Sequence, residues 1–133
     1  MRLKFAIFLA AAALFAFTAP VWAHHTFGGQ SESQYDSKDL VSLTGTIKSV
    51  DWTNPHVYVH LDVKDAAGKV TTWALEGYPP NTLKRNGFVK DDLVVGDTVT
   101  ITAYRAKDGS NAGSGREVTF RDGTKKLQGP ASR

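Results

Sequence analysis

From residue 40 onward, hydrophobic and polar residues alternate with a period of two, which is the pattern of half-buried β-strands. Five segments are predicted as strands on this basis: residues 40–48, 56–63, 70–76, 98–104 and 117–120. Turn residues separate the first two, and Ala66-Ala67-Gly68 closes a hairpin between the second and third. The predicted core residues are Leu43, Ile47, Val57, Val59, Leu61, Trp73, Leu75, Val99, Ile101 and Phe120.

A different pattern between Pro79 and Phe88 predicts one short helix. Proline is favoured at a helix start, and Asn86-Gly87 offers the left-handed glycine that often ends one. The glycine-rich stretch 108–115 is interpreted as a flexible loop. Three strands, a helix and two strands is the order of a five-stranded OB-type Greek-key barrel. The fold class is therefore all-β with one short helix, and a plain β-sandwich is the alternative.

The first 23 residues have the composition of a secretory signal peptide. Arg2 and Lys4 precede an apolar run of roughly a dozen residues, and a small residue, Ala23, ends the segment. The apolar run is shorter than a membrane span, which needs about 20 residues. We expect cleavage after Ala23, a periplasmic or secreted location, and a mature form without a membrane span. His24 then becomes the amino-terminal residue.

The expected organisation follows from these assignments. A signal peptide at 1–23 precedes an extended polar arm at 24–38, which Phe27 and Tyr35 are expected to anchor. An OB-like domain covers 39–128, and a loose tail covers 129–133.

Charge and cysteine content narrow the classes of function. Of 16 Lys and Arg residues against 13 Asp and Glu, two lie in the leader and the rest are scattered, so no basic patch for nucleic acid is expected. The chain has no cysteine, which excludes disulfides, a lipid-bearing cysteine, c-type haem attachment and thiolate metal ligands. No nucleophile motif such as Gly-x-Ser-x-Gly occurs, so no catalytic residue is predicted.

The four histidines lie at two places, His24 and His25 at the expected amino terminus and His56 and His60 on the second strand. Imidazole suits copper and zinc, and an amino-terminal histidine can chelate one ion with its amine and its ring together. His56 and His60 share a strand face, but their backbones lie roughly 13 Å apart, too far for one ion. We therefore choose His56 as the partner of His24, because it lies at a strand end.

Other residues complete this hypothesis. His25 points away from His24 in an extended chain, so it is a substitute ligand or a bystander. Asp62 and Glu76 are candidates to orient a ligand histidine or to complete the coordination. Ordinary surface histidines are the alternative interpretation of His56 and His60.

The leading functional hypothesis is a small exported ligand-binding or accessory module with a copper or zinc site. A second hypothesis is a carbohydrate- or peptide-binding module that uses an aromatic face of Trp52, Tyr58 and Tyr78 and no metal. An oxidative enzyme built on a histidine brace is a third, and a chain of this length offers little surface for it.

Several runs of the sequence resemble a family of small exported bacterial proteins catalogued only as a domain of unknown function. The resemblance covers nearly all of residues 23–128. The runs are Ala23-His24-His25-Thr26-Phe27, Leu43-Thr44-Gly45, Trp52-Thr53-Asn54-Pro55-His56-Val57, Trp73-Ala74-Leu75-Glu76-Gly77, Asn81-x-Leu83-x-Arg85-x-Gly87 and Gly96-Asp97-x-Val99-Thr100. The resemblance implies an exported single domain and carries over no activity or catalytic residue. The strand pattern is also similar to that of bacterial periplasmic OB-fold domains, a likeness of fold that does not settle function.

Overall fold

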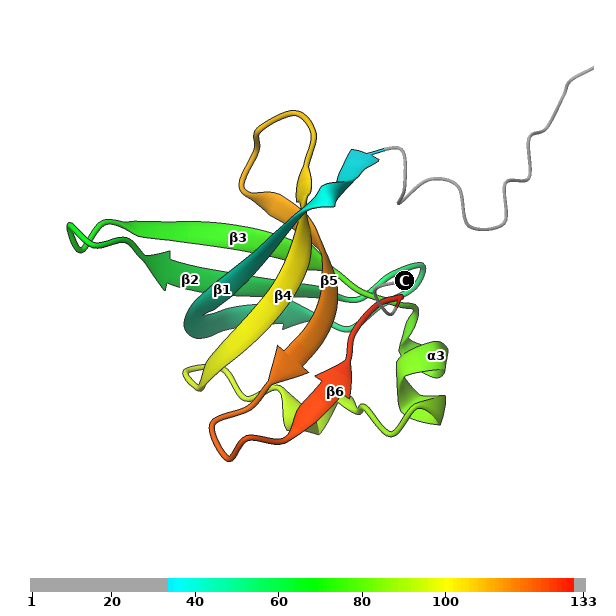
Figure 1. Ribbon diagram of the computed structural model, residues 1–133. Coiled ribbons are helices and arrows are strands. Elements are labelled where there is room, and N and C mark those ends of the chain that lie inside the picture. The colour runs from blue at the N-terminus through cyan, green and yellow to red at the C-terminus, as the bar shows by residue number, and fades with distance from the viewer. Residues whose placement is uncertain (1–33, 131–133) are drawn as a thin grey trace, which may run out of the picture.

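The computed structural model describes residues 34–130, which fold as a strongly bent sheet with one short α-helix at its side (Figure 1). The prediction of a mostly β fold with one short helix is therefore confirmed. The elements in chain order are β1 (Tyr35–Asp51), β2 (Tyr58–Lys64), β3 (Val70–Glu76), α3 (Pro80–Arg85), the 3₁₀ helix η1 (Lys90–Asp92), β4 (Thr98–Ala106), β5 (Ala112–Thr119) and β6 (Lys125–Leu127).

The sheet is organised around the long strand β1, which pairs with β2 and with β4. β2 also pairs with β3, β4 with β5, and β5 with β6, all antiparallel, so the order is β3-β2-β1-β4-β5-β6. β3 and β5 meet in addition in a short parallel ladder, in which Leu75 lies opposite Gly113. Each of the strands β1 to β4 therefore has two strand neighbours, and β5 has three.

A glycine permits the close approach of β2 to β1. A Cβ atom at Gly45 would overlap the backbone carbonyl of Asp62 and would come within 3.0 Å of the Leu61 side chain. The register between the two strands shifts just beyond this point, between Ile47 and Ser49. The small residue in mid-strand is thus required by packing.

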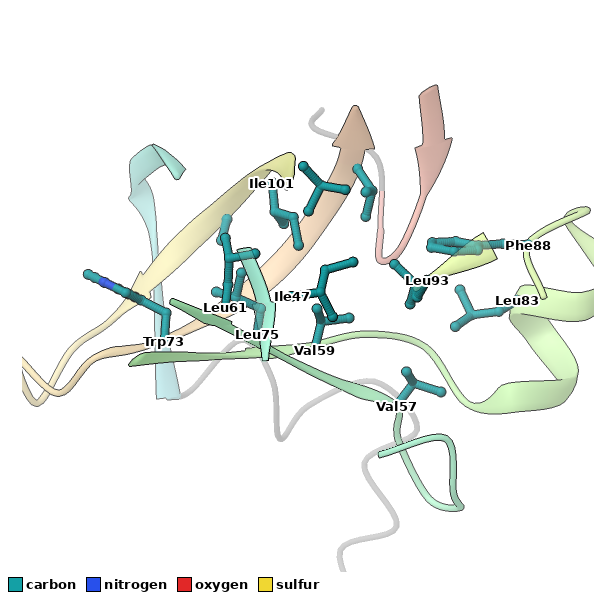
Figure 2. Close-up of a cluster of buried hydrophobic side chains, with 13 residues drawn as sticks. Ile47, Val57, Val59, Leu61, Trp73, Leu75, Leu83, Phe88, Leu93 and Ile101 are labelled. Carbon is teal, nitrogen blue, oxygen red and sulfur yellow. The ribbon is translucent and has the colours of Figure 1, made fainter. Parts of the chain in front are cut away.

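The core lies inside the bent sheet, and it extends from Trp73 at one end to Leu83 and Phe88 at the other (Figure 2). Every predicted core residue belongs to it or packs against it, Leu43 and Phe120 being only partly buried. The sequence analysis did not predict the other core members, which are Leu83, Phe88, Leu93, Ala103 and Val118. The helix therefore closes one end of the core with Leu83.

Two strand predictions were wrong in extent. β1 begins at Tyr35, so part of the segment assigned to the arm is strand. β5 begins at Ala112, inside the stretch interpreted as a flexible loop, and β6 was not predicted. The helix prediction is correct: α3 is capped at Asn86, and Gly87 follows with a φ of 75°.

The segment after β6 is fixed to the sheet by a buried glutamine. Gln128 has no solvent exposure, and its backbone N–H donates to the Arg116 carbonyl over 2.8 Å. Its carbonyl accepts the N–H of Tyr78 over 2.8 Å, and its side-chain amide donates to the Leu75 carbonyl over 3.0 Å. Gly129, expected in a loose tail, is buried as well. The segment thus bridges the end of β3 and the middle of β5.

We expect Gln128→Ala to lower the free energy of unfolding by about 1–3 kcal/mol, because it leaves the buried Leu75 carbonyl without this donor. Urea denaturation followed by circular dichroism measures the change. The neighbouring Leu127 has 44 % exposure, so Leu127→Ala is the control and should change stability by about 0.5 kcal/mol or less. Equal effects of the two substitutions would contradict this role of Gln128.

Candidate functional site

The polar residues of greatest interest lie where β2 and β3 pair next to the β1–β2 loop. Glu76, the last residue of β3, lies opposite Tyr58 in the register of this pair. Its side chain is only 11 % exposed, although the residue stands on the face of the sheet opposite the hydrophobic core. A buried carboxylate is costly unless its oxygens accept hydrogen bonds, so its partners define the site.

Two side chains bond the two oxygens of Glu76. The Tyr35 hydroxyl donates to Oε2 over 2.7 Å, and Nδ1 of His56 contacts Oε1. Because a carboxylate can only accept, Nδ1 carries the hydrogen of this contact. The neutral imidazole then keeps its lone pair on Nε2, and the His56 side chain is 37 % exposed. The result is an oriented imidazole with one nitrogen available at the surface.

The backbone holds His56 at this place through bonds beyond the ends of β2 and β3. The Val57 N–H donates to the Tyr78 carbonyl over 3.2 Å, and the Gly77 N–H donates to the Val57 carbonyl over 2.7 Å. A Cβ atom at Gly77 would lie 2.7 Å from the Gln128 side chain, so glycine is required here. His56 therefore leaves the loop on the same face as Glu76, diagonally across the two strands.

Both tyrosines beside Glu76 stay protonated at neutral pH. Burial, and then the Glu76 carboxylate, raise the pKa of Tyr35 well above its usual range. The same two causes raise the pKa of Tyr58. The phenols therefore remain donors, and they surround the carboxylate with hydroxyl groups rather than with positive charge.

The other predicted histidine of this strand has a different partner. Nε2 of His60 lies 2.9 Å from the carboxylate of Asp51, whose side chain is 63 % exposed. Asp62 accepts the Thr72 hydroxyl over 2.6 Å and contacts neither histidine among the hydrogen bonds of residues 34–130. Of the two candidate carboxylates, the structure thus brings Glu76 alone to a histidine.

The proposed metal ligands are only partly within the described chain. His24 and His25 lie outside residues 34–130. Within that range, no three His, Asp or Glu side chains are grouped so that they could hold a metal ion. His56 supplies one oriented nitrogen, and any further ligands would come from elsewhere.

The predicted aromatic face is divided between different surroundings. Trp52 and Tyr78 pack against the hydrophobic core, and the Trp52 ring meets Phe88 edge-on at 6.1 Å. Tyr58 lies on the opposite side of β2, beside Glu76. The three side chains therefore do not form one continuous aromatic platform.

Tyr35 was expected from the sequence to anchor the arm, but its bond to Glu76 was not predicted. The two residues are 41 positions apart, and Tyr35 stands in a polar run without periodicity. A large aromatic residue within such a run was the one signal available.

In the described part of the chain, no helix is long and apolar enough to cross a membrane.

We expect Tyr35→Phe to destabilise the protein by about 1.5–3 kcal/mol at pH 7, since it removes a donor from a buried carboxylate. The raised pKa of Tyr35 means that its contribution is complete below the unfolded value of about 10 and is lost as pH rises through the folded value. Stability should therefore fall more steeply above pH 10 in the natural protein than in Tyr35→Phe. Urea denaturation at several alkaline pH values measures this, and parallel curves would contradict it.

The comparisons with known proteins agree with the resemblance described from the sequence. No curated protein and no solved structure matches the chain. A family model does match, and it extends over residues 12–116, which include β1 to β4 and most of β5. The chain therefore belongs to the family of unknown function DUF6152.

Proposed function

We propose that this protein is an exported accessory module that binds a copper or zinc ion, with His56 as one nitrogen ligand. The observation that carries the proposal is the chain of contacts from Tyr35 through Glu76 to His56. A histidine that binds a metal usually donates its other ring N–H to a carboxylate or carbonyl, which fixes its tautomer and raises its basicity. His56 meets this condition before any metal is bound.

The second ligand of the proposed site is His24, as the amino terminus of the processed chain. Roughly 11 residues separate His24 from Tyr35, and an extended chain of that length spans about 36 Å. Because Tyr35 bonds Glu76, the arm joins the sheet beside His56. The arm is therefore long enough to fold back and bring the amine and the ring of His24 to Nε2 of His56.

The donor set fits these metals better than it fits calcium or magnesium. An amine and two imidazoles are nitrogen ligands, which suit copper and zinc, whereas calcium and magnesium prefer several oxygens. Both oxygens of Glu76 are already in contact with Tyr35 and His56. In this proposal Glu76 orients His56 and does not coordinate the ion itself.

We also infer that the strand pairings describe an OB-type barrel. The cycle β1-β2-β3-β5-β4 with a parallel β3–β5 contact, and a helix between β3 and β4, supports this interpretation. OB-folds commonly bind ligands on strands 2 and 3 and on the loop between strands 1 and 2. His56 is in that loop and Glu76 is on β3, so the proposed site is at a typical position for the fold, an argument by analogy.

Copper(II) titration of the protein, purified as the cell produces it, tests the role of His56. We expect His56→Ala to weaken copper binding more than any other single histidine substitution within residues 34–130, and Glu76→Gln to weaken it about 10–100-fold. His60→Ala is the matched control and should leave the affinity unchanged. An equal loss of copper affinity in His56→Ala and His60→Ala, or no loss in His56→Ala, would refute the assignment. A change in tryptophan fluorescence on addition of glycans would instead favour the aromatic alternative.

A second measurement tests the amino terminus. Mass spectrometry of the exported protein should give a chain that begins at His24. Addition of one alanine before His24 moves the amine away from the ring by one residue, so we expect it to weaken copper binding. His56→Ala in this extended protein should weaken the remaining copper binding further. Unchanged affinity in the extended protein would remove His24 from the site and leave His56 to be tested alone.

A further inference from the structure

A groove of about 480 Å³ lies between the turn that leads into β4 and the hairpin that joins β5 to β6. This volume is within the range of small-molecule sites, about 300–1,000 Å³. Val99 and Phe120 give the groove an apolar floor, and the Phe120 ring meets Phe88 edge-on at 6.0 Å. The groove shares no residue with the contacts around His56.

Three of the five charged residues that line the groove are occupied by bonds within the protein. Nζ of Lys126 lies 2.8 Å from both the Asp92 carboxylate and the Gly87 carbonyl. Burial alone would raise the pKa of Asp92, but the bonds from Lys126 and from the Val89 N–H outweigh it and lower that pKa. The Asp122 carboxylate accepts the Thr124 N–H over 2.8 Å and so stabilises the hairpin turn.

The remaining two charges have opposite signs and lie on the two segments that line the groove, which we call its walls. Asp97 belongs to the turn before β4, and Arg121 belongs to the β5–β6 hairpin. Neither forms an ion pair or a side-chain hydrogen bond with any residue of the range 34–130. Both are exposed, so a ligand can reach them.

Each wall is held in place by backbone hydrogen bonds. The Gly96 N–H donates to the Ile47 carbonyl over 2.8 Å, and the Ile47 N–H donates to the Asp97 carbonyl over 2.9 Å. In the hairpin, the Phe120 N–H donates to the Thr124 carbonyl over 2.8 Å. The two charges are therefore presented from fixed backbone positions, which reduces the entropy that a ligand must overcome on binding.

We propose that this groove binds a short zwitterionic peptide, with its ammonium group at Asp97, its carboxylate at Arg121 and an apolar side chain over Phe120. A guanidinium can bind a carboxylate with two parallel hydrogen bonds, which gives the site a direction. The ladder between β4 and β5 ends at Thr100 and Thr119, so Thr98, which lines the groove, is paired to Thr46 of β1 but not to β5. A ligand with only one charge, or with none, satisfies only part of this arrangement.

The experiment is an NMR titration of the ¹⁵N-labelled protein, purified as the cell produces it, with the dipeptide glycyl-phenylalanine. We expect chemical-shift changes at Thr98, Phe120 and Arg121. Binding should be about tenfold weaker when the amino group of the dipeptide is acetylated or its carboxylate is amidated, because each change removes a charge-assisted bond. The doubly blocked dipeptide should be weaker again, and maltose should cause no shift. Equal binding of the blocked dipeptide, binding of maltose at the same sites, or no shift with any probe would each overturn the proposal.

Two variants test which residue of the groove binds each charged end of the dipeptide. Arg121→Gln should weaken the free dipeptide about tenfold and lose the preference for a free carboxylate, and Asp97→Asn should lose the preference for a free ammonium group. Arg85→Gln and Asp91→Asn, exposed positions outside the groove, are the matched controls and should not change binding. Unchanged preferences in Arg121→Gln and Asp97→Asn would refute the assignment. Copper titration of the same variants is a separate readout, so failure here leaves the His56 proposal standing.

Discussion

The Glu76 carboxylate imposes the constraint on which the outer face of this protein depends. The Glu76 side chain is only 11 % exposed, so its carboxylate must have hydrogen-bond partners, because an isolated charge in such a place would be costly. Its partners come from the first residue of β1 and from the β1–β2 loop, with Tyr58 of β2 beside them. One acidic side chain therefore connects three strands on the face that the hydrophobic core does not reach.

The same region is where β3 and β5 meet, and small residues make that meeting possible. Glu76 lies opposite Ser114 in the parallel ladder. A Cβ atom at Gly115 would lie 2.6 Å from the Gln128 amide, and one at Gly129 would overlap the Gly115 carbonyl. The chain therefore passes close to its own backbone here, and the buried Gln128 bonds to the backbone of Leu75, Tyr78 and Arg116 across this contact.

The sequence predicted those parts of the fold that local pattern determines. Period-two alternation identified β1 to β4 and the interior residues they carry, and Asn86-Gly87 identified the end of the helix. The first half of β5 was not predicted because Gly113 and Gly115 look like loop residues. They are glycines because Tyr104 and Gln128 leave no room for a Cβ atom. Leu83, Phe88 and Leu93 were not predicted as core residues because a short helix and the loop after it are too short for a periodic pattern to reveal a buried face.

The candidate site likewise has a part that the local sequence predicts and a part that only the fold brings together. His56 could be chosen from its position at a strand end, and Glu76 from its residue type, but their contact joins residues 20 apart and depends on the strand register. Tyr35 depends on pairing over a still longer separation, which no local pattern records. The groove beside β4 is still harder to predict from the sequence, because Asp97 and Arg121 become distinctive only when the other charges around them are known to be paired. A charged residue acquires functional meaning from what its neighbours have already bonded, and that information exists only in the folded chain.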